Sequence, residues 1–381
     1  MFASNNTYKN SDYSFALEPS RVKTIIGKVV SDSSSAKYTK TLTVKLENAY
    51  CSENNSYSAK GIIRVNCKNI EAFTGDEILF NGKLSEYGFN AKSYKILKRG
   101  TIAKRRKLCI DFIDSKIKGT TDEERQLTKL LLLGIKEKDD YPLKELSRKS
   151  GSAFVLALSG MHLSFFALGI NRLLFFLGKR NSKIISLIIL TFYVIIVGAK
   201  ASLIRALLLT YSFSFRKGNR NKILLETLIL HLIFFPDSVN TLASIYSYLA
   251  LTAILGISGY IKKGLNSIYY LPNGISSSIS ASTAALIFTS QISYSTFSSY
   301  QMSIILTGGI ISFLTFSYMS IAVFSLFFPF LLELNHYCYI ALEFMMKSGA
   351  KVKECTSMFP IICLIALIIA LLLIKRREII H

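Results

Sequence analysis

Ser159, Gly160 and His162 form the most distinctive candidate site in the sequence, because they lie inside an apolar segment that runs from about residue 151 to 176. Residues three positions apart share a helix face, so Ser159 and His162 would point the same way. Polar groups inside a bilayer are costly unless they are paired or line a hydrated cavity, and small or polar residues also join neighbouring membrane helices. The motif therefore predicts either part of a polar path or a close contact between two helices.

Ser159 also resembles the nucleophile of rhomboid-type intramembrane serine proteases, which gives an enzymatic alternative. Such an enzyme needs a base, and His231 or His336 would have to face Ser159 from another helix. His162 is poorly placed as the base because it lies on the same helix, and Ala157 stands where that motif has a glycine. We therefore expect the chain not to be an enzyme.

Arg205 lies within apolar sequence, so its burial must be offset by a carboxylate, by backbone carbonyls or by water. A guanidinium group matches the oxygens of a phosphate, which makes Arg205 a candidate phosphate contact. Lys200 lies five residues earlier and fits better as a side chain that reaches a membrane interface. We treat Lys200 as a secondary candidate.

Glu226 and His231 fall in another apolar segment, at about residues 222–236. Glu226 follows Arg220 and Lys222 at helical spacing, which predicts an ion pair near a helix end. For His231, a hydrogen-bonded core histidine is expected rather than a metal ligand.

The elements that would position these residues follow from composition. The chain has 381 residues, is 50% hydrophobic and has a formal charge of +22, with a mean hydropathy of +0.37. The charge and the apolar residues are separated, because the sequence before Ser150 is polar and rich in lysine, whereas the rest is rich in Leu, Ile and Phe. This predicts an α-helical polytopic membrane protein with a small all-β, OB-like domain at the N-terminus.

Residues 1–20 are polar and are expected to be a disordered lead-in without a visible signal peptide. Residues 21–100 show a periodicity near two and five runs of strand type, which predicts the OB-like domain. Thr74-Gly75-Asp76 and Asn81-Gly82 predict turns on either side of a strand. Aromatic residues beside basic ones would suit single-strand binding, although such aromatics are also ordinary barrel residues. These pairs are Lys37-Tyr38, Tyr57 with Lys60, Tyr87 with Phe89, and Tyr94 with Lys95.

Residues 101–150 are expected to form an amphipathic helical connector. The first helix would cover about 102–117. Thr120 and Thr121, followed by acidic residues, predict the start of a second helix that ends near Gly134. A short charged helix at about 139–150 would complete the connector.

Residues 151–381 contain about eight apolar segments, judged against the roughly twenty residues that a membrane span requires. Several are shorter, which predicts some broken or tilted helices. The segments are 152–177, 184–199, 201–215, 222–236, 239–258, 275–292, 302–346 with room for two, and 358–374.

Basic clusters predict the topology, because cytoplasmic loops of membrane proteins carry an excess of Lys and Arg. The protein is expected in the cytoplasmic membrane. Because the clusters follow alternate segments, the C-terminus is expected in the cytoplasm and the N-terminal domain outside. The lysines at 347–353 argue against this orientation. Export of the domain would depend either on the first span or on upstream helices that relatives have. The clusters lie at 172–183, 216–222, 262–263 and 375–377.

The six cysteines show no C-x-x-C or zinc spacing, so neither a metal site nor a redox motif is predicted, and no cofactor is expected. Cys51 and Cys67 fall in the same small domain. They could pair if that domain lies in an oxidising compartment.

Two motifs resemble those of the ComEC family of competence membrane proteins. The first comprises Leu130–Lys138 (LLLLGIKEK) and Ser150–His162 (SGSAFVLALSGMH), and the second is Val197–Ala206 (VGAKASLIRA). Two short stretches, SQI at 290–292 and FFP at 327–329, resemble later helices of the family more weakly. The resemblance extends over about residues 22–375.

Three departures from the family pattern limit what the resemblance implies. Phe154 stands where the family pattern has a histidine, and no helices precede the OB-like domain. The C-terminal metallo-β-lactamase-like domain of many members is missing from this sequence, which has only four histidines. A nuclease role attributed to that domain is therefore not expected here.

The resemblance implies passage of single-stranded DNA across the cytoplasmic membrane during natural transformation. Its partners would be single-stranded DNA, membrane lipid, and DNA-uptake and motor proteins, and a homo-oligomer is compatible with the sequence. A motor partner is needed because the chain has no Walker-type loop. The rival function is a polytopic solute transporter or envelope-assembly protein. The implied DNA path comprises Ser159, Gly160, His162 and Arg205, with Lys200 and Gln291 as secondary candidates.

Overall fold

The chain forms two compact units, each of which is described by itself. The first consists of residues 1–141 and 192–199, and the second of residues 142–191 and 200–381. The expected connector at 101–150 is therefore divided between them. The computed structural model describes residues 8–9, 13–15, 21–35, 40–50, 56–68, 70–85, 88–135, 142–156, 160–198, 201–216, 218–239, 241–268, 271–358, 361–362, 365–366 and 368.

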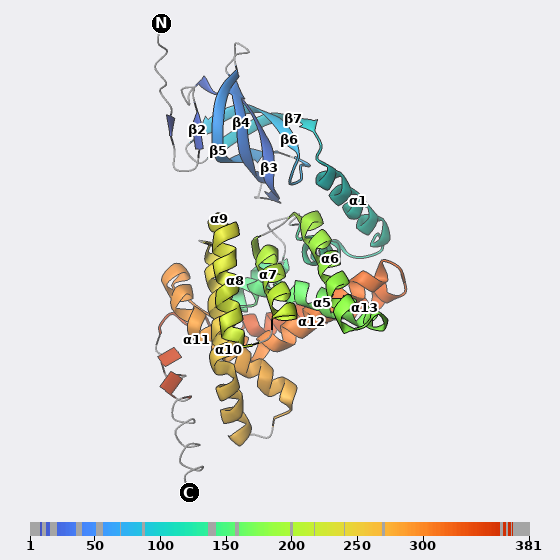
Figure 1. Cartoon of the computed structure of the whole chain (residues 1–381). Coiled ribbons are helices and arrows are strands. Elements are labelled where there is room, and N and C mark those ends of the chain that lie inside the picture. The colour runs from blue at the N-terminus through green and yellow to red at the C-terminus, as the bar shows by residue number, and fades with distance from the viewer. Residues whose placement is uncertain are drawn as a thin grey trace. The chain divides into compact units, whose positions relative to one another are not determined.

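The first unit contains a small β-barrel, as the sequence predicts (Figure 1). The strands occur in the order β1-β2-β5-β4-β3-β6-β7, and a parallel pairing of β5 with β7 closes the barrel. The other pairings are antiparallel. The strands are β1 (Tyr8–Lys9), β2 (Tyr13–Phe15), β3 (Thr24–Ser35), β4 (Lys40–Tyr50), β5 (Ser56–Cys67), β6 (Glu77–Ser85) and β7 (Gly88–Lys98).

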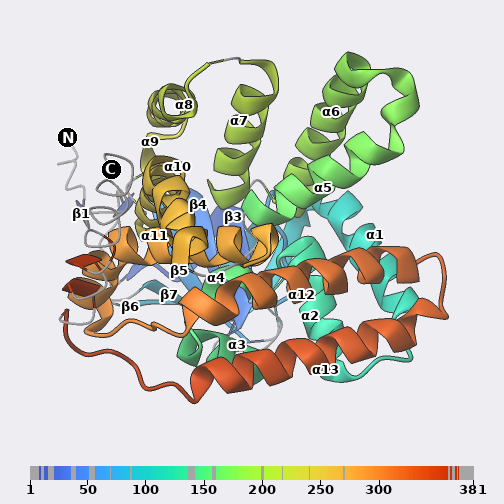
Figure 2. The same cartoon turned by 90° about the horizontal axis from the view of Figure 1, so that it is seen from below.

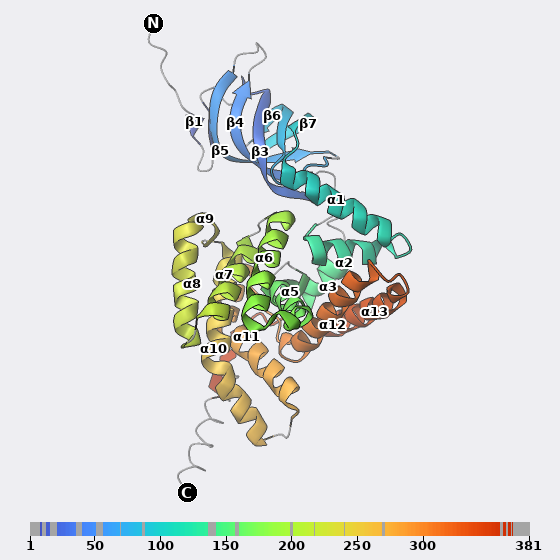
Figure 3. The same ribbon diagram turned by 45° about the vertical axis from the view of Figure 1, so that its right-hand side comes forward.

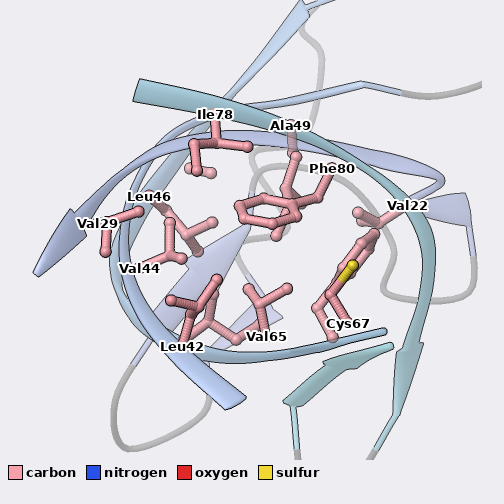
Figure 4. Close-up of a cluster of buried hydrophobic side chains, with 14 of the residues drawn as sticks. Val22, Val29, Leu42, Val44, Leu46, Ala49, Val65, Cys67, Ile78 and Phe80 are labelled. Carbon is pink, nitrogen blue, oxygen red and sulfur yellow. The ribbon is translucent and has the colours of Figure 1, made fainter. Parts of the chain in front are cut away.

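Alternating side chains of the strands fill the barrel (Figure 4). In β4, Leu42, Val44 and Leu46 point into the core while their neighbours are half-buried or exposed. Because successive strand residues face opposite sides, this alternation is the origin of the period of two in the sequence. Phe80 and Ile78 of β6 occupy the same core.

Two expectations for this unit are wrong in detail. Part of the lead-in forms β2, whose Phe15 is buried in the barrel core, and β2 pairs with β5. Asn81-Gly82 is not a turn, because β6 continues through it with a shift of register. Gly82 lies so close to β7 that an added Cβ would collide with the carbonyl oxygen of Asn90.

Two helices follow the barrel in the same unit (Figure 3). They are α1 (Thr101–Lys116) and α2 (Asp122–Leu133). Thr121 caps α2 by accepting a hydrogen bond from the backbone N–H of Glu124, whose side chain returns one to Thr121. Gly134 ends the helix in a left-handed conformation, with φ at 64°. Both ends of α2 are thus formed by residues that the sequence indicated.

The second unit is helical, and residues 192–197 at the end of α6 belong to the first unit instead. In this unit α10 packs against α11, and α12 packs against α13 (Figure 2). Its elements are α3 (Pro142–Lys149), α4 (Ala153–Leu156), α5 (Gly160–Leu173), η2 (Phe175–Leu177), α6 (Lys179–Val197), α7 (Ala201–Phe215), α8 (Arg220–Phe234), α9 (Pro236–Val239), α10 (Leu242–Ile268), α11 (Asn273–Phe297), α12 (Ile304–Ser325) and α13 (Leu331–Ala350).

Three helices in the described part of the chain are long and apolar enough to cross a membrane: α6, α10 and α12. A shorter apolar helix covers 202–215. The first predicted span, 152–177, contains α4, α5 and the short helix η2, and α5 ends at Leu173 before η2 begins at Phe175. At 1.5 Å per residue, the 14 residues of α5 extend only about 21 Å, against a bilayer core of about 30 Å. Most of the predicted span 358–374 lies outside the described residues.

Candidate functional site

The candidate site begins where α5 meets α7. Gly160, the first residue of α5, packs so closely on α7 that an added Cβ would stand 3.2 Å from the Cβ of Ala206. His162 follows on α5 and is 1% exposed. Gly160 therefore makes the close helix contact that was one of the two predicted alternatives, and His162 is a buried polar group on the same helix. This contact lies one residue from Arg205.

Arg205 is buried, with 4% of its surface exposed, and reaches from α7 to the start of α10. Its Nη1 donates a hydrogen bond of 2.7 Å to the hydroxyl of Ser244. Its Nη2 donates one of 3.3 Å to the carbonyl oxygen of Ala243. Thr241 donates to the Ser244 hydroxyl at 3.1 Å and accepts from the Ser244 backbone N–H at 3.3 Å. Both partners of Arg205 are neutral, so neither balances the charge of the guanidinium group.

His231 and Tyr248 lie beside this arginine. The His231 Nδ1 and the Tyr248 hydroxyl are 3.2 Å apart and share a hydrogen bond between α8 and α10. His231 is fully buried, which confirms the expectation of a hydrogen-bonded core histidine. Both side chains lie within electrostatic range of Arg205. We call Arg205, His231, Ser244 and Tyr248 the Arg205 cluster.

Arg205 was predicted from the sequence, whereas Ser244 and Tyr248 were not. These two residues are four positions apart on α10, so they share one face of the helix. That spacing is visible in the sequence, but the pairing with Arg205 joins residues 39 positions apart. Serine and tyrosine in an apolar helix are too common to reveal such a partner.

The other predicted residues have different surroundings. Gln291 is exposed on α11, so it does not belong to the buried cluster. Ser159 and Lys200 lie outside the described residues. Glu226 forms an ion pair with Arg216 rather than with the basic residues predicted on its own helix. The connection between α7 and α8 brings Arg216, just past the end of α7, to the side of α8 that carries Glu226.

The first residues of the Ser150–His162 motif form a tightly packed turn between α3 and α4. Ser150 is fully buried, and its hydroxyl lies 2.7 Å from that of Ser152. Ser303 donates a hydrogen bond to the Ser150 carbonyl at 3.3 Å. Gly151 has φ at 73° and leaves no room for a Cβ, which would stand 2.7 Å from the side chain of Gln301. Small residues are therefore needed here for packing.

A second buried arginine, which the sequence analysis missed, lies in the first unit. Arg106 of α1 is fully buried and donates hydrogen bonds to the carbonyl oxygens of Leu133 and Val197. The bond to Leu133 is 3.1 Å long. Gly198 follows with φ at 101°, and a Cβ there would stand 2.6 Å from Nη1 of Arg106. Tyr193 adds a hydrogen bond of 2.8 Å to the carbonyl of Leu132.

The described barrel residues considered for DNA or disulfide chemistry range from buried to exposed, and Lys60 and Lys95 are exposed. Cys67 carries a free thiol that is 2% exposed, and burial raises the pKa of this thiol. Cys51 lies outside the described residues. Phe89 is fully buried, while Tyr57 and Tyr94 are half-buried against the core. Lys37, Tyr38 and Tyr87 lie outside the described residues.

No cluster of three or more His, Cys, Asp or Glu side chains among the described residues could hold a metal ion. The Arg205 cluster consists of an arginine, a histidine and two hydroxyl groups. Such a set binds and orients charged groups through hydrogen bonds.

The chain matches the model of a known protein family. The sequence model of the family described as Competence protein matches residues 131–377, which is more than half of the chain. The matched range contains the Arg205 cluster and the three apolar helices, and it begins after the barrel. A comparison with curated proteins and a comparison with solved structures each found no match.

Proposed function

The chain belongs to the competence protein family, and on that premise we propose that it is a channel component that passes single-stranded DNA across the cytoplasmic membrane during natural transformation. Three apolar helices and the family together indicate a membrane protein with a role in competence. The single observation that carries the proposal is the buried positive charge of Arg205, whose hydrogen-bond partners among the described residues are both neutral.

The position of Arg205 favours an anion for an electrostatic reason. Ser244 and Ala243 lie in the first turn of α10, whose N-terminal end carries a partial positive charge. The guanidinium group adds a full positive charge at the same place. Two positive groups that face each other are stabilised by a negative one, and helix N-termini and arginine forks both bind phosphate. A DNA phosphate would exchange with the Ser244 hydroxyl as the partner of Nη1.

The proposed path runs along the contact between α5 and α7, past Gly160, His162 and Arg205. At the contact between α5 and α7, the small residues Gly160 and Ala206 pack closely, and Ala206 directly follows the charged Arg205 in the sequence. Ser159 and Lys200 remain predicted members of the path. Polar side chains embedded in membrane segments generally line such hydrated routes.

In this proposal the chain conducts DNA passively and is not an enzyme. The energy would come from a motor protein, and DNA-uptake proteins would deliver the strand. The β-barrel has the five main strands of an OB fold, a fold that binds single strands in other proteins. The basic loops predict a barrel outside the membrane and a C-terminus in the cytoplasm.

The test is uptake of labelled DNA into the cytoplasm of cells that depend on this chain for transformation. Arg205→Ala should reduce uptake by about 10- to 100-fold, because hydrogen bonds to charged groups contribute about 1.5–3 kcal/mol. Arg205→Lys keeps the charge but loses the fork, so it should retain part of the activity. Arg216→Ala is the matched control, since Arg216 follows α7 and is exposed.

Normal uptake by Arg205→Ala cells that contain normal amounts of the protein would contradict the proposal. Unchanged uptake together with abnormal accumulation of a small molecule would instead support the solute-transporter function. The hydrolase alternative has its own readout, because Ser159→Ala would then end a cleavage that the wild type performs.

A further inference from the structure

Helix α1 presents an apolar strip on its exposed side. Leu108 is 67% exposed and Phe112 is 44% exposed. They are four positions apart, so they lie one above the other on the same face. The opposite side of the helix carries the buried residues Ala103, Arg106 and Ile113. An exposed leucine and phenylalanine at the centre of one face are unfavourable in water, because burial of such a side chain contributes about 1.5–3 kcal/mol.

Basic side chains border this strip. Lys104 and Arg105 precede it and Lys116 follows it, all three exposed, whereas Asp111 is the acidic residue on this face. The Lys116 ammonium lies 5.7 Å from the centre of the Phe112 ring. An apolar centre flanked by lysine and arginine is the pattern of helices that lie in the headgroup region of a membrane. The long basic side chains reach the phosphates while their stems cover apolar surface.

The buried side of α1 is attached to the end of a helix that can cross a bilayer. Arg106 donates to the carbonyl of Val197, the last residue of α6, and residues 192–197 of α6 belong to the same unit as α1. The end of a membrane span lies at the depth of the lipid headgroups. The bond from Arg106 places α1 beside that end, and Leu108 and Phe112 lie on the other, exposed side of α1.

We propose that α1 is an interfacial helix that inserts Leu108 and Phe112 into the boundary between headgroups and acyl chains of anionic lipid. Lys104, Arg105 and Lys116 bind the headgroup phosphates. Basic residues alone would suit a DNA backbone equally well. The exposed leucine and phenylalanine favour lipid, because a DNA backbone offers no apolar surface to cover them.

The chain contains no tryptophan, so one introduced tryptophan reports on its own surroundings. We would reconstitute full-length Leu108→Trp and Phe112→Trp into bilayers of phosphatidylglycerol with brominated acyl chains, which quench nearby tryptophan. Ile62→Trp is the matched control, because Ile62 is 43% exposed on the barrel. Quenching at positions 108 and 112 should exceed that of the control by at least about threefold. Acrylamide in the water should quench the control more strongly.

The charges are tested by the double change Lys104→Glu and Arg105→Glu in the Phe112→Trp chain. Quenching should fall in phosphatidylglycerol, where the basic side chains meet anionic headgroups, and should change less in phosphatidylcholine. Each variant is first checked for normal amounts in the membrane. Quenching does not depend on DNA uptake, so the channel proposal and the proposal of an interfacial helix are tested separately.

Two outcomes would overturn the proposal. The first is that acrylamide quenches Phe112→Trp as strongly as Ile62→Trp and that brominated lipid quenches both equally weakly. In that case the face lies in water. The second is that the emission of Phe112→Trp is blue-shifted but neither reagent quenches it. In that case another part of the protein covers the face.

Discussion

The two units each bury an arginine, and the two arginines are held at opposite ends of helices. Arg106 donates to Leu133 and Val197, the last residues of α2 and α6, where backbone carbonyls give the helix a partial negative charge. Arg205 donates to Ala243 and Ser244 in the first turn of α10, where the helix end is positive. The same side chain therefore meets a favourable field in one unit and an unfavourable field in the other.

This difference separates a structural arginine from a functional candidate. At Arg106 two helix ends supply the negative potential that a buried cation needs, and no further ligand is required. At Arg205 the hydroxyl of Ser244 and the carbonyl of Ala243 are the hydrogen-bond acceptors among the described residues, and the proposed function adds an anion as a further partner. We therefore expect replacement of Arg106 to lower stability and replacement of Arg205 to lower DNA uptake.

The largest expected effect is that of Arg106→Ala on stability. The change removes two hydrogen bonds from a charged group and leaves two carbonyls buried, a loss of about 3–6 kcal/mol. This is a large share of the roughly 5–15 kcal/mol that stabilises a typical protein. Thermal unfolding in detergent and the amount of protein in membranes should both fall sharply. If Arg205→Ala lowered thermal stability and the amount of protein in membranes by as much, the two arginines could not be distinguished.

Gly198→Ala should have the next largest effect, because it places a Cβ 2.6 Å from Arg106 at a residue with φ at 101°. Gly178→Ala is the matched control, since Gly178 has φ at 81° and open space around it. Both variants bear the backbone cost of about 1–3 kcal/mol, and only the first also displaces Arg106. A melting temperature lowered equally in both would show that the contact with Arg106 is unimportant.

A smaller effect is expected for Ser244→Ala, which removes one of the two neutral partners of Arg205. The folded state should lose about 1–2 kcal/mol, since one hydrogen bond to a charged group is lost. Arg205 would then be freer to bind phosphate, so DNA uptake per molecule of protein should stay near normal or rise. Loss of uptake as complete as in Arg205→Ala would mean that the Ser244 hydroxyl itself is required.

The smallest effect is expected for Tyr248→Phe, which removes only the hydrogen bond to His231. The cost should be about 0.5–1.5 kcal/mol in stability, measured by thermal unfolding. Uptake should change less than about twofold, because Arg205 keeps both of its own partners. A larger loss of uptake would indicate that Tyr248 itself lines the proposed DNA path.

The parts of the fold that follow from local rules were predictable. The period of two in β4 and the cap at Thr121 depend on neighbours in the sequence, and both occur as expected. Arg106 was missed because it stands within Lys104–Lys107, a run of basic residues that is typical of a solvated helix face. Its only signal is its spacing from Ala103 and Ile113, the other buried residues of α1.

The candidate site was predictable only in part. Gly160, His162 and Arg205 stood out because polar or small residues are unusual in apolar segments, and the structure buries His162 and Arg205. Their partners come from helices far along the chain, and no local pattern encodes those contacts. The predicted ion pair of Glu226 with Arg220 or Lys222 is wrong for the same reason, because a turn supplied a better placed arginine.

The bond from Arg106 to Val197 joins residues 91 positions apart and has a consequence for synthesis. Domains generally fold as units while the chain leaves the ribosome. The first unit lacks its last segment, residues 192–199, until α6 has been synthesised, so it can complete its fold only after that helix has been made. Under the proposed topology, in which the barrel lies outside, this order would let the barrel cross the membrane before its unit is complete.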